Sequence, residues 1–179
     1  MKNENIEKQK KAKKQNEAVG MNEDIVHLIL EDHKPLKELI KTMKDSDKSE
    51  VEREAAFLKF APLLAVHAKA EEEVLYVFMK KNKDLIDDAF EGDVEHGLAD
   101  QMLTEAKAIQ EKHLRNARIK VLAELVEHHI EEEENNVLPE FEKSSAKPQR
   151  LALGSLYSIT KQNIKGNGQE KDPSFVPLQ

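Results

Sequence analysis

The chain has 179 residues, and 35% of them are charged, with a formal net charge of −7 at pH 7. This acidic balance argues against nucleic acid as the main partner, because phosphate binding requires a basic face. The chain has no cysteine, which excludes disulfides, cysteine-ligated zinc and iron–sulfur clusters. Any bound metal must therefore be held by nitrogen and oxygen.

The two ends of the chain differ in composition from its middle. Residues 1–20 are basic and lack the apolar segment of a secretory signal, and residues 166–179 combine glycine, proline and charge. We expect both to be flexible tails around one domain at residues 21–165. No stretch approaches the roughly 18 apolar residues of a membrane span, so we expect a cytoplasmic protein without one.

Apolar residues at helical spacing predict two helices in the first half of the domain. The first should run over about residues 23–43, with Asn22 or Asp24 near its cap. Its buried stripe should be Val26, Ile29, His33, Leu36, Ile40 and Met43. After a polar turn, the second should occupy about residues 51–81, with a kink or a late start at Pro62. Its stripe should be Phe60, Leu63, His67, Glu71, Val74 and Phe78.

The second half predicts two more helices and a short addition. Gly92 and Gly97 each weaken the third helix by about 1 kcal/mol relative to alanine. Its stripe should be Ala89, His96, Ala99, Leu103 and Ala106. The fourth helix should run over about residues 114–138, with Pro139 beyond its end. Its stripe should be Ile119, Leu122, Val126, His129, Glu133 and Val137. Residues 147–165 predict a short fifth helix over one end.

Short connections make consecutive helices antiparallel neighbours, so the predicted fold is all-α, an up-down-up-down four-helix bundle. The chain also contains an internal repeat. In each half, a lone histidine on the first helix is followed by His-x-x-x-Glu on the second, at nearly the same separation. Such a repeat places the histidines of both halves at a similar depth in the bundle.

Six ionisable residues occupy positions on these stripes where aliphatic residues are expected. They are His33, His67, Glu71, His96, His129 and Glu133. Burial of an unpaired ionisable group costs several kcal/mol unless something compensates. Six such groups converging in one bundle predict a compensating cation, and hence a metal site.

The helix face separates these residues from other histidines with the same spacing. His-x-x-x-Glu also occurs at His27/Glu31 and His128/Glu132, where solvated neighbours one turn apart are the expected arrangement. We prefer His129 to its neighbour His128 as a ligand because His128 is rotated toward the flank of the helix. His113 lies in a polar segment and is expected to be exposed.

Four imidazoles and two carboxylates exceed the needs of one tetrahedral zinc. They suit two divalent ions, each with two terminal histidines and both carboxylates as bridges, and with a bridging oxo or hydroxo group. One open position per ion would remain for dioxygen, nitric oxide, peroxide or azide. Iron is favoured over manganese because most of the ligands are imidazoles, and over zinc because of the number of ligands. Candidate hydrogen-bond partners of the imidazoles are Glu31, Asp32, Glu95 and Asp100, although we expect these acids mainly to face solvent or to pair with lysines.

Four segments resemble the hemerythrin-like (HHE) cation-binding family over about residues 21–141. They are EDHKPLKELI around His33, HAKAEEEVLY from His67, DVEHGLADQML around His96 and HIEEEENNVLP from His129. The family's most diagnostic element, HxxxEE followed by an apolar pair, occurs twice. The resemblance implies an antiparallel four-helix bundle with a non-haem di-iron centre. The implied ligands are His33, His67, His96 and His129, and the implied bridges are Glu71 and Glu133.

The chain departs from the oxygen-carrying hemerythrins, which have a fifth histidine one turn after that of the third helix and an aspartate as last bridge. Here these positions hold Asp100 and Glu133. The pattern is closer to members with four histidines and two glutamates, which include iron-centre repair proteins and iron or oxygen sensors. The repair proteins also carry a cysteine-containing N-terminal domain, which this chain lacks.

The leading hypothesis is a di-iron protein that binds or senses dioxygen, nitric oxide or peroxide, more a binding protein than an enzyme. The alternative is a di-iron enzyme or iron donor in oxidative or nitrosative stress and iron-centre repair. Tyr76 would be a redox neighbour of the centre in that case and is otherwise a core residue. A third hypothesis is a helical bundle used for protein interaction, in which the histidines have only a structural role.

Overall fold

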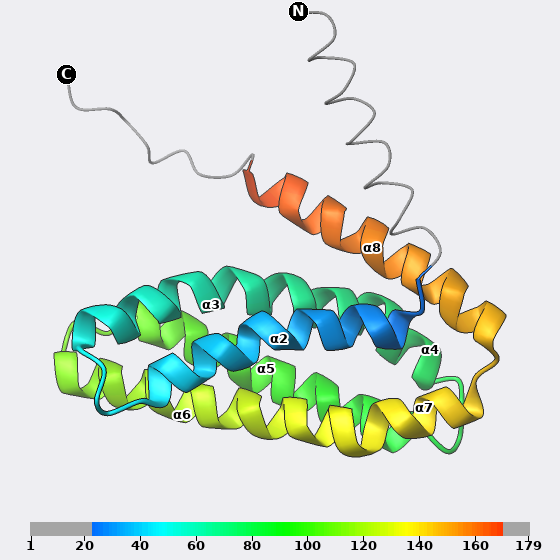
Figure 1. Ribbon diagram of the computed structural model, residues 1–179, viewed down its shortest axis with the longest axis horizontal. Coiled ribbons are helices and arrows are strands. Elements are labelled where there is room, and N and C mark those ends of the chain that lie inside the picture. Colours follow the sequence, from blue (N-terminus) through cyan, green and yellow to red (C-terminus); the bar gives the residue numbers. More distant parts are fainter. Residues whose placement is uncertain (1–22, 170–179) are drawn as a thin grey trace, which may run out of the picture.

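The computed structural model describes residues 23–169, which form helices and turns with no strand among them. The predicted tail at 1–20 and most of that at 166–179 lie outside the described residues. The elements are α2 (Ile25–Lys44), α3 (Glu50–Glu71), η2 (Glu72–Tyr76), α4 (Val77–Met79), α5 (Ile86–Ala108), α6 (Lys112–Glu132), η3 (Glu133–Val137), α7 (Leu138–Ser144) and α8 (Lys147–Gln169). In Figure 1, α2, α3, α5 and α6 lie side by side as a helical bundle, and α8 slants away from the end of the bundle near α4 and α7.

Side-chain caps fix where the first two helices begin. The Asp24 carboxylate accepts a hydrogen bond of 3.1 Å from the Val26 amide, which confirms Asp24 as the cap of α2. Ser49 and Glu52 form a reciprocal capping box at the start of α3. Because this box starts α3 at Glu50, the late start predicted at Pro62 is wrong. Pro62 lies inside the helix on its exposed face.

Two apolar clusters build the core, and the histidine stripe lies between them along the helices. The first cluster includes Leu36, Leu64 and Ala99, and the second includes Ile29 and Ala70 among others. On α2, His33 therefore lies between a residue of the second cluster and one of the first. The same change of cluster occurs at His67 of α3 and at His96 of α5, whereas on the fourth helix it falls between Ile130 of α6 and Val137 of η3. The core thus consists of two apolar blocks with a polar layer between them.

The predicted stripes of α5 and α6 are confirmed, since all their members are buried. The stripe of α3 is wrong at one position, because Leu63 is 38% exposed and Leu64 is 3% exposed. Spacings of three and four residues both keep a side chain on one helix face, so periodicity alone does not choose between these neighbours. In α2, likewise, Ile25 is buried and Val26 is only partly so.

A π-helical turn follows Glu71, and a second one begins at Glu133. Each π-helical turn contains one residue more than an α-helical turn, and such turns are found frequently at functional sites. After η2 the extra residue leaves Phe78 half-buried and buries Met79 instead. After η3 the chain continues as α7 through Pro139, so the predicted helix end before this proline is wrong. Pro139 falls in the first turn of α7, where the missing N–H is tolerated.

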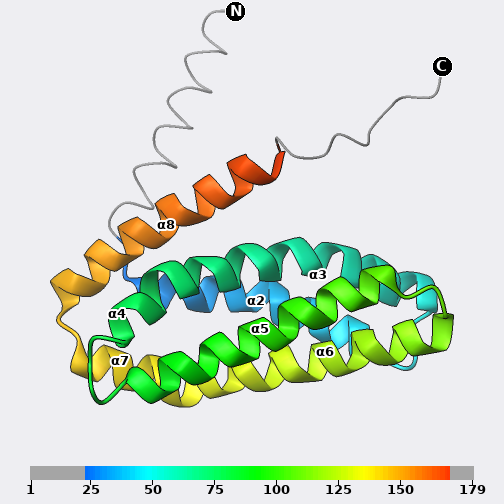
Figure 2. The same ribbon diagram turned by 180° about the vertical axis from the view of Figure 1, so that it is seen from behind.

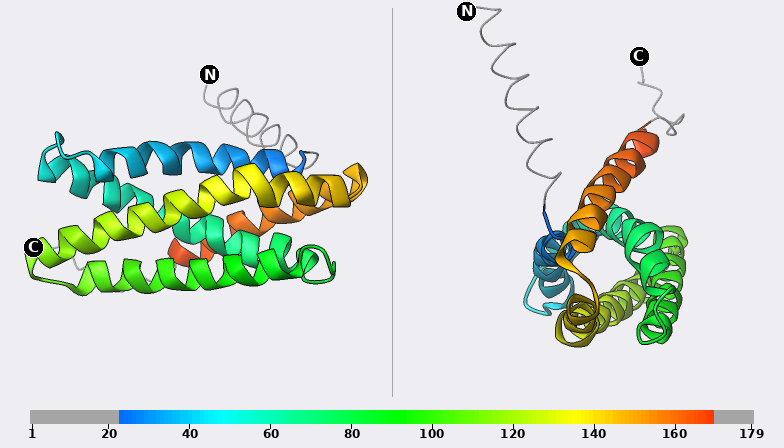
Figure 3. Two further views of the ribbon diagram at one scale, coloured as in Figure 1. Left: turned by 90° about the horizontal axis from the view of Figure 1, so that it is seen from below. Right: turned by 90° about the vertical axis from the view of Figure 1, so that its right-hand side faces the viewer.

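The fifth helix is longer than expected, and it packs against the side of the bundle and not only over one end. α8 reaches Gln169 and contacts α2, α3 and η2. Figures 2 and 3 show it starting after α7 at one end of the bundle and running obliquely back past α2 and α3, with its C-terminal turns pointing away from the bundle. Tyr157 of α8 is fully buried. Within residues 23–169, no helix has both the length and the apolar character needed to cross a bilayer.

Gly154 permits the close approach of α8 to the start of α2. A Cβ atom at this position would lie 2.0 Å from the backbone oxygen of Glu23, so the backbone would have to shift. We expect Gly154→Ala to destabilise the protein by about 1–3 kcal/mol, the usual cost of overpacking. Gly166→Ala on the same helix meets no atom within 4 Å and should be neutral or stabilising by up to about 1 kcal/mol. Urea unfolding measures both, and equal stability of the two variants would contradict this packing.

Gly92 has a packing role in α5 that Gly97 lacks. A Cβ atom on Gly92 would lie 2.6 Å from both Cζ and Oη of the buried Tyr76, whereas one on Gly97 meets nothing within 4 Å. Gly92→Ala should therefore displace the tyrosine ring and lower the unfolding midpoint, while Gly97→Ala should raise it through better helix propensity. Thermal unfolding followed by circular dichroism distinguishes them. A higher midpoint for both variants would refute the close contact.

Candidate metal centre

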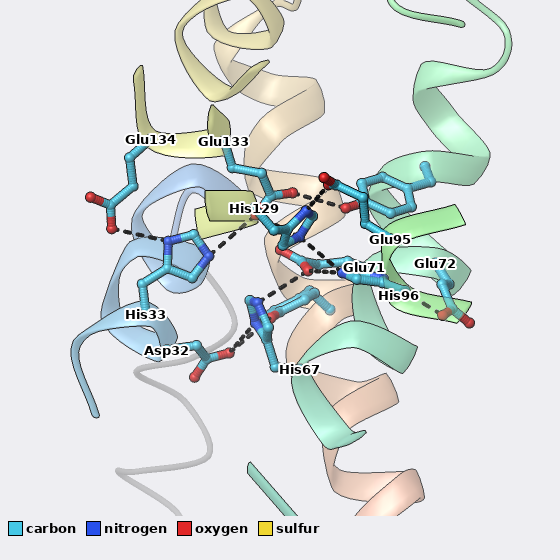
Figure 4. Close-up of polar contacts among 12 residues, drawn as sticks. Asp32, His33, His67, Glu71, Glu72, Glu95, His96, His129, Glu133 and Glu134 are labelled. Atoms are coloured by element: carbon cyan, nitrogen blue, oxygen red, sulfur yellow. Dashed lines mark hydrogen bonds and ion pairs between the residues drawn. The ribbon is translucent and has the colours of Figure 1, made fainter. Parts of the chain in front are cut away.

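The structure brings all six predicted site residues together in the polar layer, which we define by these residues. Each is at most 4% exposed. Figure 4 shows their side chains pointing toward one another from four helices and the start of η3. The members of the polar layer are His33, His67, Glu71, His96, His129 and Glu133.

Each carboxylate of the polar layer lies between a histidine of its own half of the chain and one of the other half. Glu71 Oε2 is 3.1 Å from His67 Nε2 and 3.6 Å from His96 Nε2. Glu133 Oε2 is 3.6 Å from His129 Nε2 and 3.3 Å from His33 Nε2. The internal repeat therefore produces the same arrangement twice, with the two halves exchanging one contact each.

Two overlapping groups in this layer have the spacing needed to hold a cation. One consists of His33, His67, Glu71 and Glu133, and the other of Glu71, His96 and His129. In each group the potential ligand atoms lie within 4.8 Å of one another, and Glu71 belongs to both. The layer thus offers two adjacent cation positions with a shared carboxylate.

Several inward atoms of the layer have no hydrogen-bond partner. They include Nε2 of His33, Nε2 of His67, both carboxylate oxygens of Glu71, and Oε2 of Glu133. Buried polar atoms are normally paired, because each unpaired one costs on the order of 1–3 kcal/mol. Imidazole nitrogen and carboxylate oxygen are ligands of iron, manganese and zinc. The donor set therefore fits a first-row divalent cation, which would satisfy these atoms.

Burial and mutual repulsion shift the ionisation of the layer. Burial, followed by repulsion from Glu133, raises the pKa of Glu71 well above its ordinary value. For Glu133, burial alone would raise the pKa, but the charges of His129 and His33 outweigh it and lower the pKa. Burial lowers the pKa of His67 to about 4, so this imidazole is neutral near pH 7. A neutral imidazole has the lone pair that a metal ligand needs.

The outward nitrogen of each imidazole faces an acceptor. His33 Nδ1 is 3.1 Å from Oε1 of Glu134, and His129 Nδ1 is 2.6 Å from Oε2 of Glu95. When Nδ1–H donates to such an acceptor, Nε2 is left unprotonated and directed into the layer. Partners of this kind orient metal-binding histidines and usually raise their basicity.

The other two imidazoles follow the same plan. His67 Nδ1 is 3.2 Å from the hydroxyl oxygen of Tyr157. His96 Nδ1 faces Oε1 of Glu72 at 3.6 Å, within ion-pair distance but without a hydrogen bond. In Figure 4 the outer partners Glu72, Glu95 and Glu134 lie around the polar layer. All four imidazoles thus have Nδ1 outward and Nε2 inward.

Of the expected outer partners, the structure confirms Glu95 directly, and Asp32 contacts the network around His67. The other two lie away from the layer, as we mainly expected for these acids. Glu31 pairs with Lys34 at the surface, and Asp100 is exposed. Both belong to helix faces that point away from the layer.

Sequence reasoning missed Glu72 and Glu134, although a signal was available. Both are the second glutamate of HxxxEE, and one residue rotates the side chain by about 100° toward the neighbouring helix. Tyr76 was expected as a core residue or a neighbour of Glu71. It is buried and donates a hydrogen bond of 2.9 Å to Glu133, in the other half of the chain.

The other histidines in His-x-x-x-Glu pairs are exposed, as expected. The side chain of His27 is 58% exposed and that of His128 is 69% exposed. Glu95, His128 and Glu132 form a third group with cation-binding spacing, but it lies outside the buried layer. The structure therefore directs His129, and not His128, into the centre.

Comparison with known proteins agrees with this geometry. No curated protein and no solved structure matched the chain. The model of the hemerythrin HHE cation-binding domain matches residues 24–141, which is more than half of the chain and contains the whole polar layer. The chain therefore belongs to the hemerythrin HHE cation-binding domain family.

Proposed function

We propose that the polar layer holds two iron ions and that the protein binds or senses a small ligand, dioxygen, nitric oxide or peroxide, at this centre. The observation that carries the proposal is the pair of overlapping donor groups, several of whose inward atoms lack partners. We propose all six members of the layer as ligands, with the four histidines terminal and Glu71 and Glu133 as bridges. We also propose that the bundle has the up-down-up-down order expected from its short connections.

The number and type of donors support an iron pair. A single tetrahedral zinc would leave two of the six donors unused. Both carboxylates approach histidines from each half of the chain, as carboxylates that bridge two ions would. The absence of cysteine and the majority of imidazole donors favour iron over softer or harder cations. When bound, the iron pair would supply redox chemistry and an open coordination position.

The surrounding residues prepare the layer for that role. The outer acceptors hold the imidazoles with Nε2 inward, and Tyr76 fixes Glu133 by donating to its Oε1 atom. The two apolar clusters exclude water from both sides of the layer. Exclusion of water strengthens the electrostatic interactions of a bound ligand.

A small cavity beside the layer supports a small ligand. It has a volume of about 20 Å³, enough for a single water-sized molecule, and its lining includes Tyr76, Gly92, Glu95, His129 and Glu133. A diatomic molecule or a peroxide is of this size. A larger cavity of about 310 Å³ has His96 and Glu72 in its lining, so the small ligand is inferred from the cavity beside Tyr76 and Glu133.

The purified protein should contain about two iron ions per chain, one for each donor group. The oxidised protein should show a charge-transfer band that changes when azide is added. Metal analysis and an optical spectrum before and after azide test both statements. Isolation with zinc alone from iron-replete cells, or no response to azide, would contradict the proposal. Steady turnover of peroxide or nitric oxide under anaerobic reductant would favour the alternative of an enzyme.

Neighbouring histidines provide a matched test of the ligand assignment. We expect His129→Gln to lower iron content to one ion per chain or less, because its Nε2 faces the layer. His128→Gln should leave iron content and the azide spectrum unchanged, because that side chain is exposed. Both variants carry the same substitution on the same turn of α6, so they control for effects on helix propensity. Equal iron content in the two would rule out the proposed role of His129.

A further inference from the structure

The acceptor for one imidazole of the layer comes from outside the family domain. The family match ends at residue 141, and α8 begins at Lys147. Nevertheless Tyr157 of α8 is fully buried, and its hydroxyl oxygen lies 3.2 Å from His67 Nδ1. The other three imidazoles have carboxylates from within residues 24–141 as their outer partners.

Tyr157 is itself held by a charged pair. Its hydroxyl group donates a hydrogen bond of 2.8 Å to Asp32 Oδ2. Lys161, one turn further along α8, pairs with both carboxylate oxygens of Asp32. The ion pair keeps Asp32 as an acceptor, so the single proton of the tyrosine hydroxyl is directed to Asp32.

This arrangement determines which nitrogen of His67 carries the proton. Since Tyr157 donates to Asp32, its oxygen is left to accept from His67 Nδ1–H. His67 Nε2 is then unprotonated and faces Glu71 Oε2 at 3.1 Å. Asp32 Oδ2 lies 3.8 Å from His67 Nδ1, beyond hydrogen-bond distance, so it does not replace the hydroxyl.

We propose that Tyr157 and Lys161 are positioning residues of the metal centre, and that α8 is a functional part of it. The inference rests on the proposed function and deepens it. Because α8 orients His67 for the metal, docking of α8 and metal occupancy favour each other, and this coupling is reciprocal. Metal binding therefore tightens α8 on α2 and α3, and loss of the Tyr157 or Lys161 contact weakens metal binding.

The test compares full-length Tyr157→Phe and Lys161→Met with wild type. Losing such a partner usually lowers metal affinity about 10–100-fold, so after loading with Fe²⁺ the rate of iron release to a chelator should rise by up to this factor. Lys165→Met serves as the control because Lys165 is exposed on the next turn of α8. Lys161→Arg should restore retention, since it keeps the charge beside Asp32. The Co²⁺-loaded proteins should show the same order in their visible absorption spectra, which report histidine coordination.

The outcomes separate this inference from the proposed function. If α8 is merely structural, the variants will lower the unfolding midpoint of the metal-free protein while iron release and the Co²⁺ spectrum stay as in wild type. That result overturns the inference and leaves the di-iron centre standing. If the wild-type protein binds neither Fe²⁺ nor Co²⁺, both proposals fail. Amide exchange in α8 should slow on metal binding in wild type, and an unchanged rate would also count against the coupling.

Discussion

Ionisable side chains buried between two apolar clusters impose the dominant constraint on this structure. Transfer of such groups out of water is costly, and hydrogen bonds from the fold compensate for only some of their atoms. The outward nitrogens of His33, His67 and His129 find partners, whereas Nε2 of His33 and both oxygens of Glu71 do not. The fold therefore satisfies the outer surface of the layer and leaves its inner surface to a cation. Stability and metal binding are linked for the same reason.

The internal repeat explains how so few residues make a symmetrical site. Each HxxxEE motif supplies a histidine and a carboxylate to the layer, and its second glutamate faces the lone histidine of the other half. Glu72 approaches His96, and Glu134 approaches His33. The second glutamate of each motif therefore reaches its histidine only when the two halves of the chain pack against each other. The π-helical turns after these motifs occur in the same places in both halves, which indicates that they belong to the repeat.

Much of the site was predictable because helical periodicity is a short-range property. Histidines on an apolar stripe identify the buried face directly, and four stripes of similar length place those faces at a similar depth. What periodicity missed has an equally local cause. A π-helical turn has no distinct residue pattern, so its effects on Met79 and Pro139 were not visible in the sequence. The choice between Leu63 and Leu64 depended on packing against neighbouring helices, which spacing does not contain.

The placement of α8 could not be predicted for a different reason. A short helix was expected in this segment, but its docking depends on Tyr157 meeting Asp32 and His67, which are distant in sequence and share no periodic relation with it. A buried tyrosine hydroxyl requires a partner, so Tyr157 alone signals that α8 must meet a polar group somewhere in the bundle. In this layer the available group was the outward nitrogen of His67. The limits of the family domain therefore differ from the limits of the site.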